Sequence, residues 1–336
     1  MVSATSTQNR ASRLQTFVPV ITLAVMVVLL SVLNSAFLSM GTLLNLMAQV
    51  SVIGIVALGA TIVLITAGLD FSSGSGLAAI GMAIGAMFVH TGGNGLAMMA
   101  TAVLGGAVLG SVNGFLVSKL GIVPFIATLA VMLVAQGLST FIEDGGMMLL
   151  ADSPLLWIGQ GRLAGIPVAF FIYLGACVVL AALLNRTRIG TYVYAVGGNE
   201  AAARYSGIKV ERVKFYCYLI AGVCTGVAAL ITVTKIGMAT PGISGSTLLD
   251  AIAASVIGGA SLSGGRGTVT GTFIGVAIVV LIGTGLTYLS IPAEMQDVFK
   301  GAVILVAVCF DQIIRNYAKH YQTNSLVNSN IPQDNE

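Results

Sequence analysis

Side chains that could perform acid–base, metal or phosphate chemistry are few in this sequence and widely separated. The two histidines, His90 and His320, each lack a second metal ligand at a suitable spacing. The four cysteines fall in apolar stretches without a C-x-x-C pair, so we interpret them as small buried residues. No phosphate-binding G-x-x-x-x-G-K-[ST] loop is present. We therefore expect no catalytic residue, no metal site and no cofactor bound by this chain.

One short run imitates a nucleotide-site motif. The sequence Leu-Ser-Gly-Gly-Arg at 262–266 resembles the signature of ATP-binding cassette ATPases. A working site of that kind also needs a phosphate-binding loop, and this run lies between two apolar stretches. We interpret it as a glycine-rich turn between helices.

The elements that must position the remaining polar residues are membrane helices. The chain has 336 residues, of which only 8% are charged and 57% are hydrophobic. Soluble proteins carry about 25% charged residues. There are 56 uncharged residues between Arg13 and Asp70, and 48 between Asp70 and Lys119. A helix crosses the hydrocarbon layer with about 20 residues, so the sequence predicts an all-α, polytopic membrane protein.

Glycine, proline, asparagine and charged residues divide the apolar runs into about ten transmembrane helices. We expect them near 17–33, 43–67, 77–89, 96–117, 122–142, 166–184, 215–233, 249–262, 269–289 and 298–314. Two of them are short. The segments 71–89 and 249–262 are compatible with either full spans or broken helices.

Basic residues indicate how these spans are threaded. With a cytoplasmic N-terminus, twelve Lys and Arg residues fall inside and three outside, as the positive-inside rule requires. We therefore expect both termini in the cytoplasm, as tails 1–13 and 317–336 around one transmembrane domain, 14–316. Five spans in each half would give the halves opposite directions, which suits an inverted-repeat transporter core.

Glycines four residues apart predict close helix packing. Gly106, Gly110 and Gly114 form one such series, and Gly271 and Gly275 another. Small residues at this spacing let helix backbones approach closely in lipid. The alternatives are a subunit interface or a smooth pore wall.

Six polar residues within or beside the spans are candidates for lining a translocation pathway: Asn45, Gln49, Asp70, Ser72, Asn113 and Asp250. For the uncharged ones, interhelical hydrogen bonding is the alternative. Asp70 stands in a Gly- and Ser-rich stretch, where it can cap the next helix; a role on the transport route is its other interpretation. The sequence shows no cluster of acids of the kind that proton- or sodium-driven carriers use.

The longest cytoplasmic loop, 185–214, carries six basic and two acidic residues. It contains a short helix by its local signals: Asn199 suits the N-cap, Glu200 complements the N-terminal dipole, and Gly207 suits the C′ position. Two turns of helix are unstable alone in water. The helix must therefore dock against this protein's own cytoplasmic face or a partner, through Asn199, Glu200, Ala201, Ala202, Arg204 and Gly207.

Four segments resemble the membrane-spanning permease of bacterial ATP-binding cassette importers for ribose and related simple sugars. They are GLDFSSGS at 68–75, VPFIATL at 123–129, GGNEAAARYSGI at 197–208 and LDAIAASVIGGASLSGGRG at 249–267. The resemblance implies an inner-membrane permease that dimerises and pairs with two cassette ATPases. It also implies that a periplasmic binding protein delivers the sugar and that the partner ATPases bind ATP. The 199–207 helix would then couple these ATPases to the permease.

Two other functions stay open from the residues alone. One is an ABC permease for another small solute, such as branched-chain amino acids or a furanosyl signal molecule. The other is a stand-alone ion-coupled carrier. The net charge of +3 is explained by membrane topology, so we expect lipid and protein partners and no nucleic acid.

Overall fold

The computed structural model describes residues 20–244, 246–292, 295–302 and 305. The chain divides into two compact units, residues 1–291 and 292–336, and the first contains the helical bundle. The tails 1–13 and 317–336, the start of the first expected span and most of the last lie outside the described residues. The domain limits 14–316 stay a prediction.

Seven helices in the described chain are long and apolar enough to cross a membrane. They are α2 (Met40–Ile65), α3 (Ser72–Thr91), α4 (Gly95–Ser118), α5 (Pro124–Phe141), α7 (Val168–Arg186), α10 (Val210–Ile236) and α12 (Val269–Tyr288). Two shorter apolar helices are Val20–Leu33 and α11 (Thr247–Ile257). The expectation of a polytopic, essentially all-α protein is confirmed; the full count of ten spans stays a prediction.

Short elements connect these helices. They are the 3₁₀ turns η1 (Ser35–Leu38) and η2 (Ile142–Gly145), the strands β1 (Met148–Leu149), β2 (Arg162–Leu163), β3 (Ile166–Pro167) and β4 (Met238–Ala239), and the helices α6 (Leu156–Gln160), α8 (Arg188–Gly198) and α9 (Glu200–Tyr205). Strand β1 pairs antiparallel with β4, and β2 with β3.

The long helices begin and end at residues with clear chemical reasons. The side chains of Ser39, Asn94 and Thr268 accept hydrogen bonds from the first turns of α2, α4 and α12, which satisfies otherwise unpaired N–H groups. Helix α10 ends at Gly237, which adopts a left-handed conformation that glycine tolerates without steric cost. Local sequence therefore sets these four boundaries.

The two segments that the sequence left open differ in the structure. Segment 71–89 belongs to α3, a continuous helix of 20 residues. Segment 249–262 contains only the 11-residue α11. Before it, residues 240–244 form no helix, and Ile243 lies beside Gly81 of α3. Leu248, in the first turn of α11, lies beside Gly74 of the same helix. The passage between α10 and α12 is therefore a broken helix.

Helix α4 packs on α10 almost backbone to backbone. A Cβ atom added to Gly110 would lie 2.3 Å from the Tyr218 carbonyl oxygen, and one on Gly106 2.4 Å from the Gly222 carbonyl oxygen. On the other side of the bundle, Gly275 would meet the Ala254 carbonyl oxygen in the same way and joins α12 to α11. The predicted close packing through four-residue glycine spacing is confirmed.

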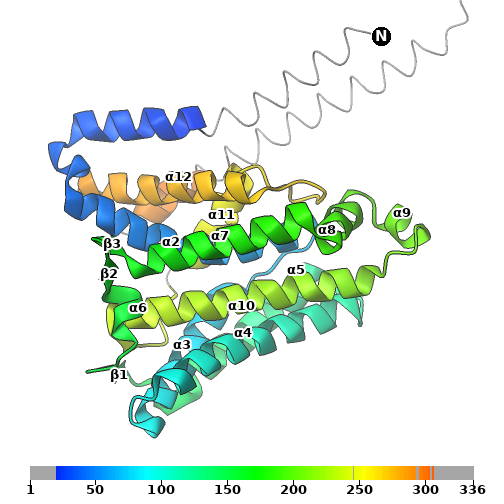
Figure 1. Ribbon diagram of the computed structural model, residues 1–336, viewed down its shortest axis with the longest axis horizontal. Helices are drawn as coiled ribbons and strands as arrows, with labels where there is room; N and C mark the ends of the chain where they lie inside the picture. Colours follow the sequence, from blue (N-terminus) through cyan, green and yellow to red (C-terminus); the bar gives the residue numbers. More distant parts are fainter. Residues whose placement is uncertain (1–19, 245, 293–294, 303–304, 306–336) are drawn as a thin grey trace, which may run out of the picture. The chain divides into compact units, whose positions relative to one another are not determined.

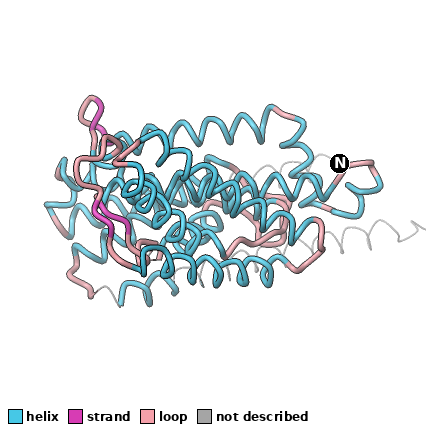
Figure 2. The backbone as a smooth tube through the Cα atoms, turned by 90° about the horizontal axis from the view of Figure 1, so that it is seen from below, coloured by secondary structure: helices cyan, strands magenta, loops and turns pink. Residues whose placement is uncertain are grey.

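The two ends of the helical bundle differ in their connections. Figure 1 shows α6 and the strands β1–β3 at one end, and α8 and α9 at the other. Figure 2 shows the strands together at a single end of the bundle. The bundle therefore has one end with short strands and one end with short helices, and the connections 185–214 belong to the end with short helices.

The close contact between α4 and α10 predicts that Gly110→Ala lowers the melting temperature of the purified protein in detergent. Overpacking of this kind costs about 1–3 kcal/mol. Gly137 in α5 is the matched control, because a Cβ there meets nothing within 4 Å. We expect Gly137→Ala to melt at or slightly above the wild-type temperature; equal melting of both variants would contradict the packing argument.

Candidate functional site

The short helix that the sequence predicts in loop 185–214 is present as α9 (Glu200–Tyr205). The Asn199 side chain accepts a hydrogen bond from the Ala202 N–H at 3.0 Å. At the other end, the Gly207 N–H bonds the Arg204 carbonyl and the Ile208 N–H bonds the Ala203 carbonyl, with Gly207 at φ 81°. This is a Schellman ending. The predicted N-cap and C′ residues are confirmed.

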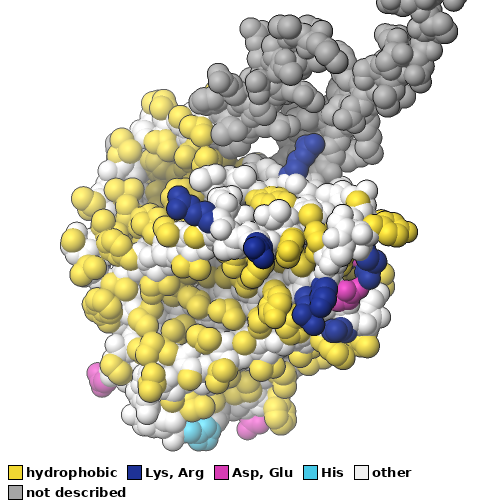
Figure 3. Space-filling model, turned by 45° about the vertical axis from the view of Figure 1, so that its right-hand side comes forward, with side chains coloured by type: hydrophobic (Ala, Val, Ile, Leu, Met, Phe, Trp, Pro, Cys, Tyr) yellow, Lys and Arg dark blue, Asp and Glu magenta, His cyan; other side chains and the backbone are white. Residues whose placement is uncertain are grey.

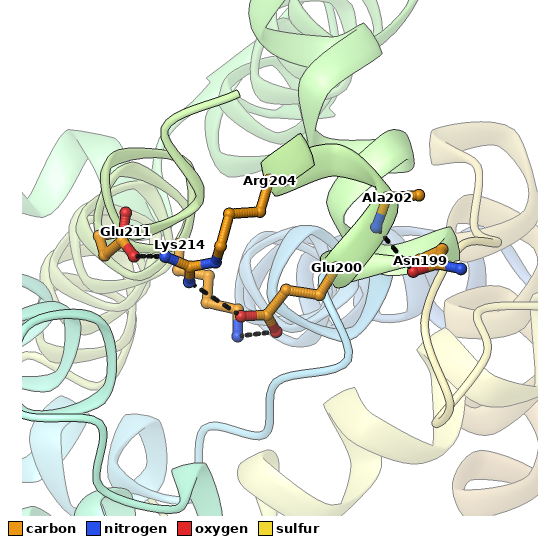
Figure 4. Close-up of polar contacts among 6 residues, drawn as sticks. All are labelled: Asn199, Glu200, Ala202, Arg204, Glu211 and Lys214. Carbon is orange, nitrogen blue, oxygen red and sulfur yellow. Dashed lines mark hydrogen bonds and ion pairs between the residues drawn. The ribbon is translucent and has the colours of Figure 1, made fainter. Parts of the chain in front are cut away.

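A network of charges ties α9 to the first turns of α10. Figure 4 shows Glu200 between Lys214 and Arg204, with Arg204 also reaching Glu211. The Lys214 Nζ–Glu200 Oε2 distance is 2.7 Å, the Arg204 Nη1–Glu211 Oε1 distance is 2.6 Å, and the Arg204 Nη2–Glu200 Oε1 distance is 3.5 Å. Both glutamates of the loop are therefore engaged in holding α9 in one orientation.

The electrostatics of this network favour the ionised state. The hydrogen bond from Lys214 lowers the pKa of the Glu200 carboxyl from its ordinary value of 4.5, and Arg204 lowers it further. Glu200 consequently carries its charge at neutral pH. Because its pKa in the folded protein is depressed, its contribution to holding α9 is present above pH 4.5 and is lost as the pH falls further.

The outer face of α9 is open. Ala201 and Ala202 are exposed and Ala203 is buried, while Tyr205 is 94% exposed. A large aromatic side chain that is almost fully exposed to solvent is typical of a protein-binding surface. Figure 3 shows basic side chains gathered on the same end of the molecule, among largely apolar surroundings.

A second group of polar residues meets at the start of α3. The Asp70 carboxylate accepts from the Ser72 N–H at 2.9 Å and from the Ser72 hydroxyl at 2.7 Å. The Asn113 side-chain amide of α4 donates to Ser72 Oγ at 2.6 Å and reaches Asp70 Oδ1 at 3.5 Å. All three are buried. The structure thus joins three predicted pathway residues into one hydrogen-bonded cluster.

Neighbouring helices close this cluster. The Tyr218 hydroxyl of α10 donates to the Leu69 carbonyl at 3.0 Å, and the Thr128 hydroxyl of α5 lies 3.4 Å from the same oxygen. The Oδ1 atom of Asn113 is buried without a hydrogen-bond partner among the described residues. The cluster therefore fixes the α2–α3 connection to three other helices.

The other three predicted pathway residues lie elsewhere. Asn45 and Gln49 are one turn apart on α2, and both are exposed. Asp250 is buried in the first turn of α11, where Ser246 Oγ bonds its carboxylate at 2.9 Å. No group of three or more His, Cys, Asp or Glu residues that could hold a metal ion occurs in the described part of the chain.

Sequence reasoning missed some members of this site. It predicted α9 without α8, and it assigned no role to Tyr205, Glu211 or Lys214. The aromatic residue next to the predicted helix end was an available signal for a docking surface. The pairing of Glu200 with Lys214, 14 residues away, depends on how α9 folds back on α10 and has no local signal.

Comparisons with known proteins all identify permease components of transport systems. Residues 42–308 match the family described as "Branched-chain amino acid transport system / permease component". The "Ribose import permease protein RbsC" of Bacillus subtilis (strain 168) is 42% identical over 299 residues, which cover 88% of this chain and 92% of the relative. No solved structure matches the chain.

Two further relatives have the same kind of printed name. The "Ribose import permease protein RbsC" of Escherichia coli (strain K12) is 39% identical, and the matched residues cover 87% of this chain and 92% of that relative. The "Galactose/methyl galactoside import permease protein MglC" of Haemophilus influenzae (strain ATCC 51907 / DSM 11121 / KW20 / Rd) is 35% identical, and the matched residues cover 88% of this chain and 94% of that relative. The chain belongs to this permease family. The permease is accordingly a multi-pass protein of the inner membrane.

The Asp70 cluster predicts different results for two substitutions. Asn at position 70 keeps an oxygen that accepts from Ser72, so Asp70→Asn should fold and transport nearly as the wild type. Asp70→Ala leaves the buried Ser72 N–H without its acceptor, which costs about 1–3 kcal/mol. Thermal unfolding and uptake assays of both variants check this. A large loss of uptake by Asp70→Asn at normal protein levels would show that the charge itself is required.

Proposed function

We propose that this chain is the permease subunit of an ATP-driven importer for a simple sugar, with ribose the first candidate. The observation that carries the proposal is the combination of a capped, charge-fixed α9 with an open outer face and an otherwise apolar bundle. The named ribose permeases, at 42% and 39% identity, support ribose over the galactose permease at 35%.

In this proposal the chain performs no bond chemistry. ATP is bound and hydrolysed by partner cassette ATPases, and α9 docks on them through Tyr205 and the exposed alanines. Nucleotide binding then biases a two-state change of the permease, so that the pathway opens alternately to each side. A periplasmic binding protein delivers the sugar, and a second permease subunit completes the pathway.

The proposed orientation places both termini and α8–α9 in the cytoplasm, with the strands β1–β4 and α6 on the periplasmic side. The packing supports an inverted repeat of two halves within this orientation. Helix α2 ends at the α8–α9 end and α10 ends at the strands, so they run in opposite directions. Helix α2 packs on α11 and α12, while α10 packs on α3 and α4.

The two halves also share a local feature. Each long central helix is followed by a non-helical stretch and then by a helix with a buried aspartate at its start, Asp70 for α3 and Asp250 for α11. A serine hydroxyl bonds each carboxylate. The same order of long helix, non-helical stretch and helix with a buried aspartate thus occurs twice, in opposite directions. This supports α2–α3 and α10–α11 as equivalent parts of an inverted repeat.

One alternative solute has a specific observation in its favour. The matching family is described by branched-chain amino acid transport. Uptake by the permease reconstituted with its cognate ATPase and binding protein separates the candidates. We expect ATP-dependent uptake of radiolabelled ribose, with galactose and leucine as comparison solutes. Uptake without any ATPase would instead indicate a stand-alone carrier.

The orientation gives a prediction of its own. Ala201 in α9 and Leu149 in β1 are exposed, and a membrane-impermeant thiol reagent should label only Leu149→Cys in intact spheroplasts. Ala201→Cys should react after the membrane is permeabilised. Labelling of both positions from the same side would contradict the proposed threading.

The charge network predicts that Glu200→Lys uncouples the importer. The substitution puts a positive charge beside Lys214 and Arg204 and at the positive end of the α9 dipole. We expect uptake per ATP hydrolysed to fall about tenfold, within the range of typical coupling energies. The double variant Glu200→Lys/Lys214→Glu restores the ion pair between positions 200 and 214 with reversed sign and should recover part of the loss. If the wild type and Glu200→Lys show equal uptake per ATP hydrolysed, the contact that couples the permease to the ATPase lies elsewhere.

A further inference from the structure

The last turn of α8 rests on the end of α2 with no side chain between them. A Cβ atom on Gly197 would lie 1.6 Å from the Ile65 carbonyl oxygen and 2.7 Å from the Gly265 amide nitrogen. The Gly265 N–H in turn donates to the same Ile65 carbonyl at 2.8 Å. Three segments that are distant in the sequence therefore meet backbone to backbone.

The third segment is the glycine-rich loop 261–267, which includes the run that imitates an ATPase signature. Gly264 and Gly265 have φ of 82° and 75°, a region that favours glycine. A Cβ on Gly264 would lie 2.7 Å from the Gly197 carbonyl oxygen and 2.9 Å from the Cβ of Ala67. The loop is thus wedged between α8 and the chain that follows α2.

One side chain reinforces this contact. The Tyr194 hydroxyl, one turn before Gly197 on α8, donates to the Gly267 carbonyl at 2.7 Å. The loop itself is closed by a bond from the Ser261 N–H to the Arg266 carbonyl at 3.0 Å. Because α11 ends just before the loop and α12 begins just after it, a displacement of α8 reaches both helices.

We propose that Gly197, Gly264 and Gly265 form a rigid joint that transmits movement of α9 to α2, α11 and α12. Only Asn199 separates α8 from α9, and contacts between backbones contain no rotatable side chain that could absorb a displacement. The three glycines are positioning residues. The proposal rests on the proposed function, since it needs α9 to receive the movement of an ATPase.

The adjacent glycines 197 and 198 provide a matched test. A Cβ on Gly198 meets nothing within 4 Å, whereas a Cβ on Gly197 must push α8 away from Ile65. In the complex reconstituted with ATPase and binding protein, Gly197→Ala should lower ribose uptake per ATP hydrolysed about tenfold. ATPase association should remain, because α9 keeps its own caps and charges. Gly198→Ala should retain the wild-type ratio.

A second pair of variants covers the case in which Gly197→Ala fails to fold. Tyr194→Phe removes the hydroxyl that bonds Gly267 and adds no atoms, so it should lower the same ratio about two- to fivefold. Tyr192→Phe changes an exposed residue of the same helix and should leave the ratio unchanged. A merely structural role would lower protein yield and both activities together, without changing their ratio.

The outcomes separate this proposal from the proposed function. If the wild-type complex shows no ATP-dependent uptake of any tested solute, the proposed function fails. If the wild type is active and Gly197→Ala folds with the ratio of Gly198→Ala, the joint is overturned. If Gly197→Ala does not fold, an unchanged ratio in Tyr194→Phe overturns it.

Discussion

Close approach of one backbone to another is the constraint on which this structure depends. Within lipid, helices gain nothing from excluding water and associate through packing and hydrogen bonds, so glycine occupies the contact points. Gly110 brings α4 onto α10, and Gly275 brings α12 onto α11. Gly197 brings α8 onto the end of α2 by the same means. The first two contacts hold the bundle together, and the third attaches the short helices of loop 185–214 to it.

This attachment connects the site near α9 to the central helices of the bundle. The network around Glu200 fixes α9 on the first turns of α10, and α8 fixes its other end on α2 and on loop 261–267. These are the helices that the two proposed halves contribute to the centre of the bundle. The Asp70 cluster lies directly after the same end of α2 and binds α3 to α4. The ion pairs of α9, the glycine contacts between α8 and α2, and the buried hydrogen bonds of the Asp70 cluster thus form a continuous series of contacts.

The sequence could predict features that depend on neighbouring residues. The caps Asn199 and Gly207 and the glycine spacing in α4 belong to this class, and so do most span boundaries. It could not predict α8, whose glycines and tyrosines are poor helix formers and whose contacts come from α7, α10 and α2. The break before α11 has a local signal in Pro241 and Gly242, while the contact of Ile243 with α3 needs the folded chain. Loop 261–267 was correctly interpreted as a turn, while its contact with Gly197 needs the folded chain.

The most direct measurement of the central claim is the distance between spin labels on the two sides of the joint. Ala201 in α9 and Thr270 in α12 are exposed, and Trp157 in α6 provides a reference at the opposite end of the bundle. Pulsed electron paramagnetic resonance would compare the nucleotide-free and ATP-trapped complexes. A rigid joint predicts an unchanged Ala201–Thr270 distance together with a changed Ala201–Trp157 distance. A change between Ala201 and Thr270 while Thr270 and Trp157 keep their separation would contradict a rigid joint.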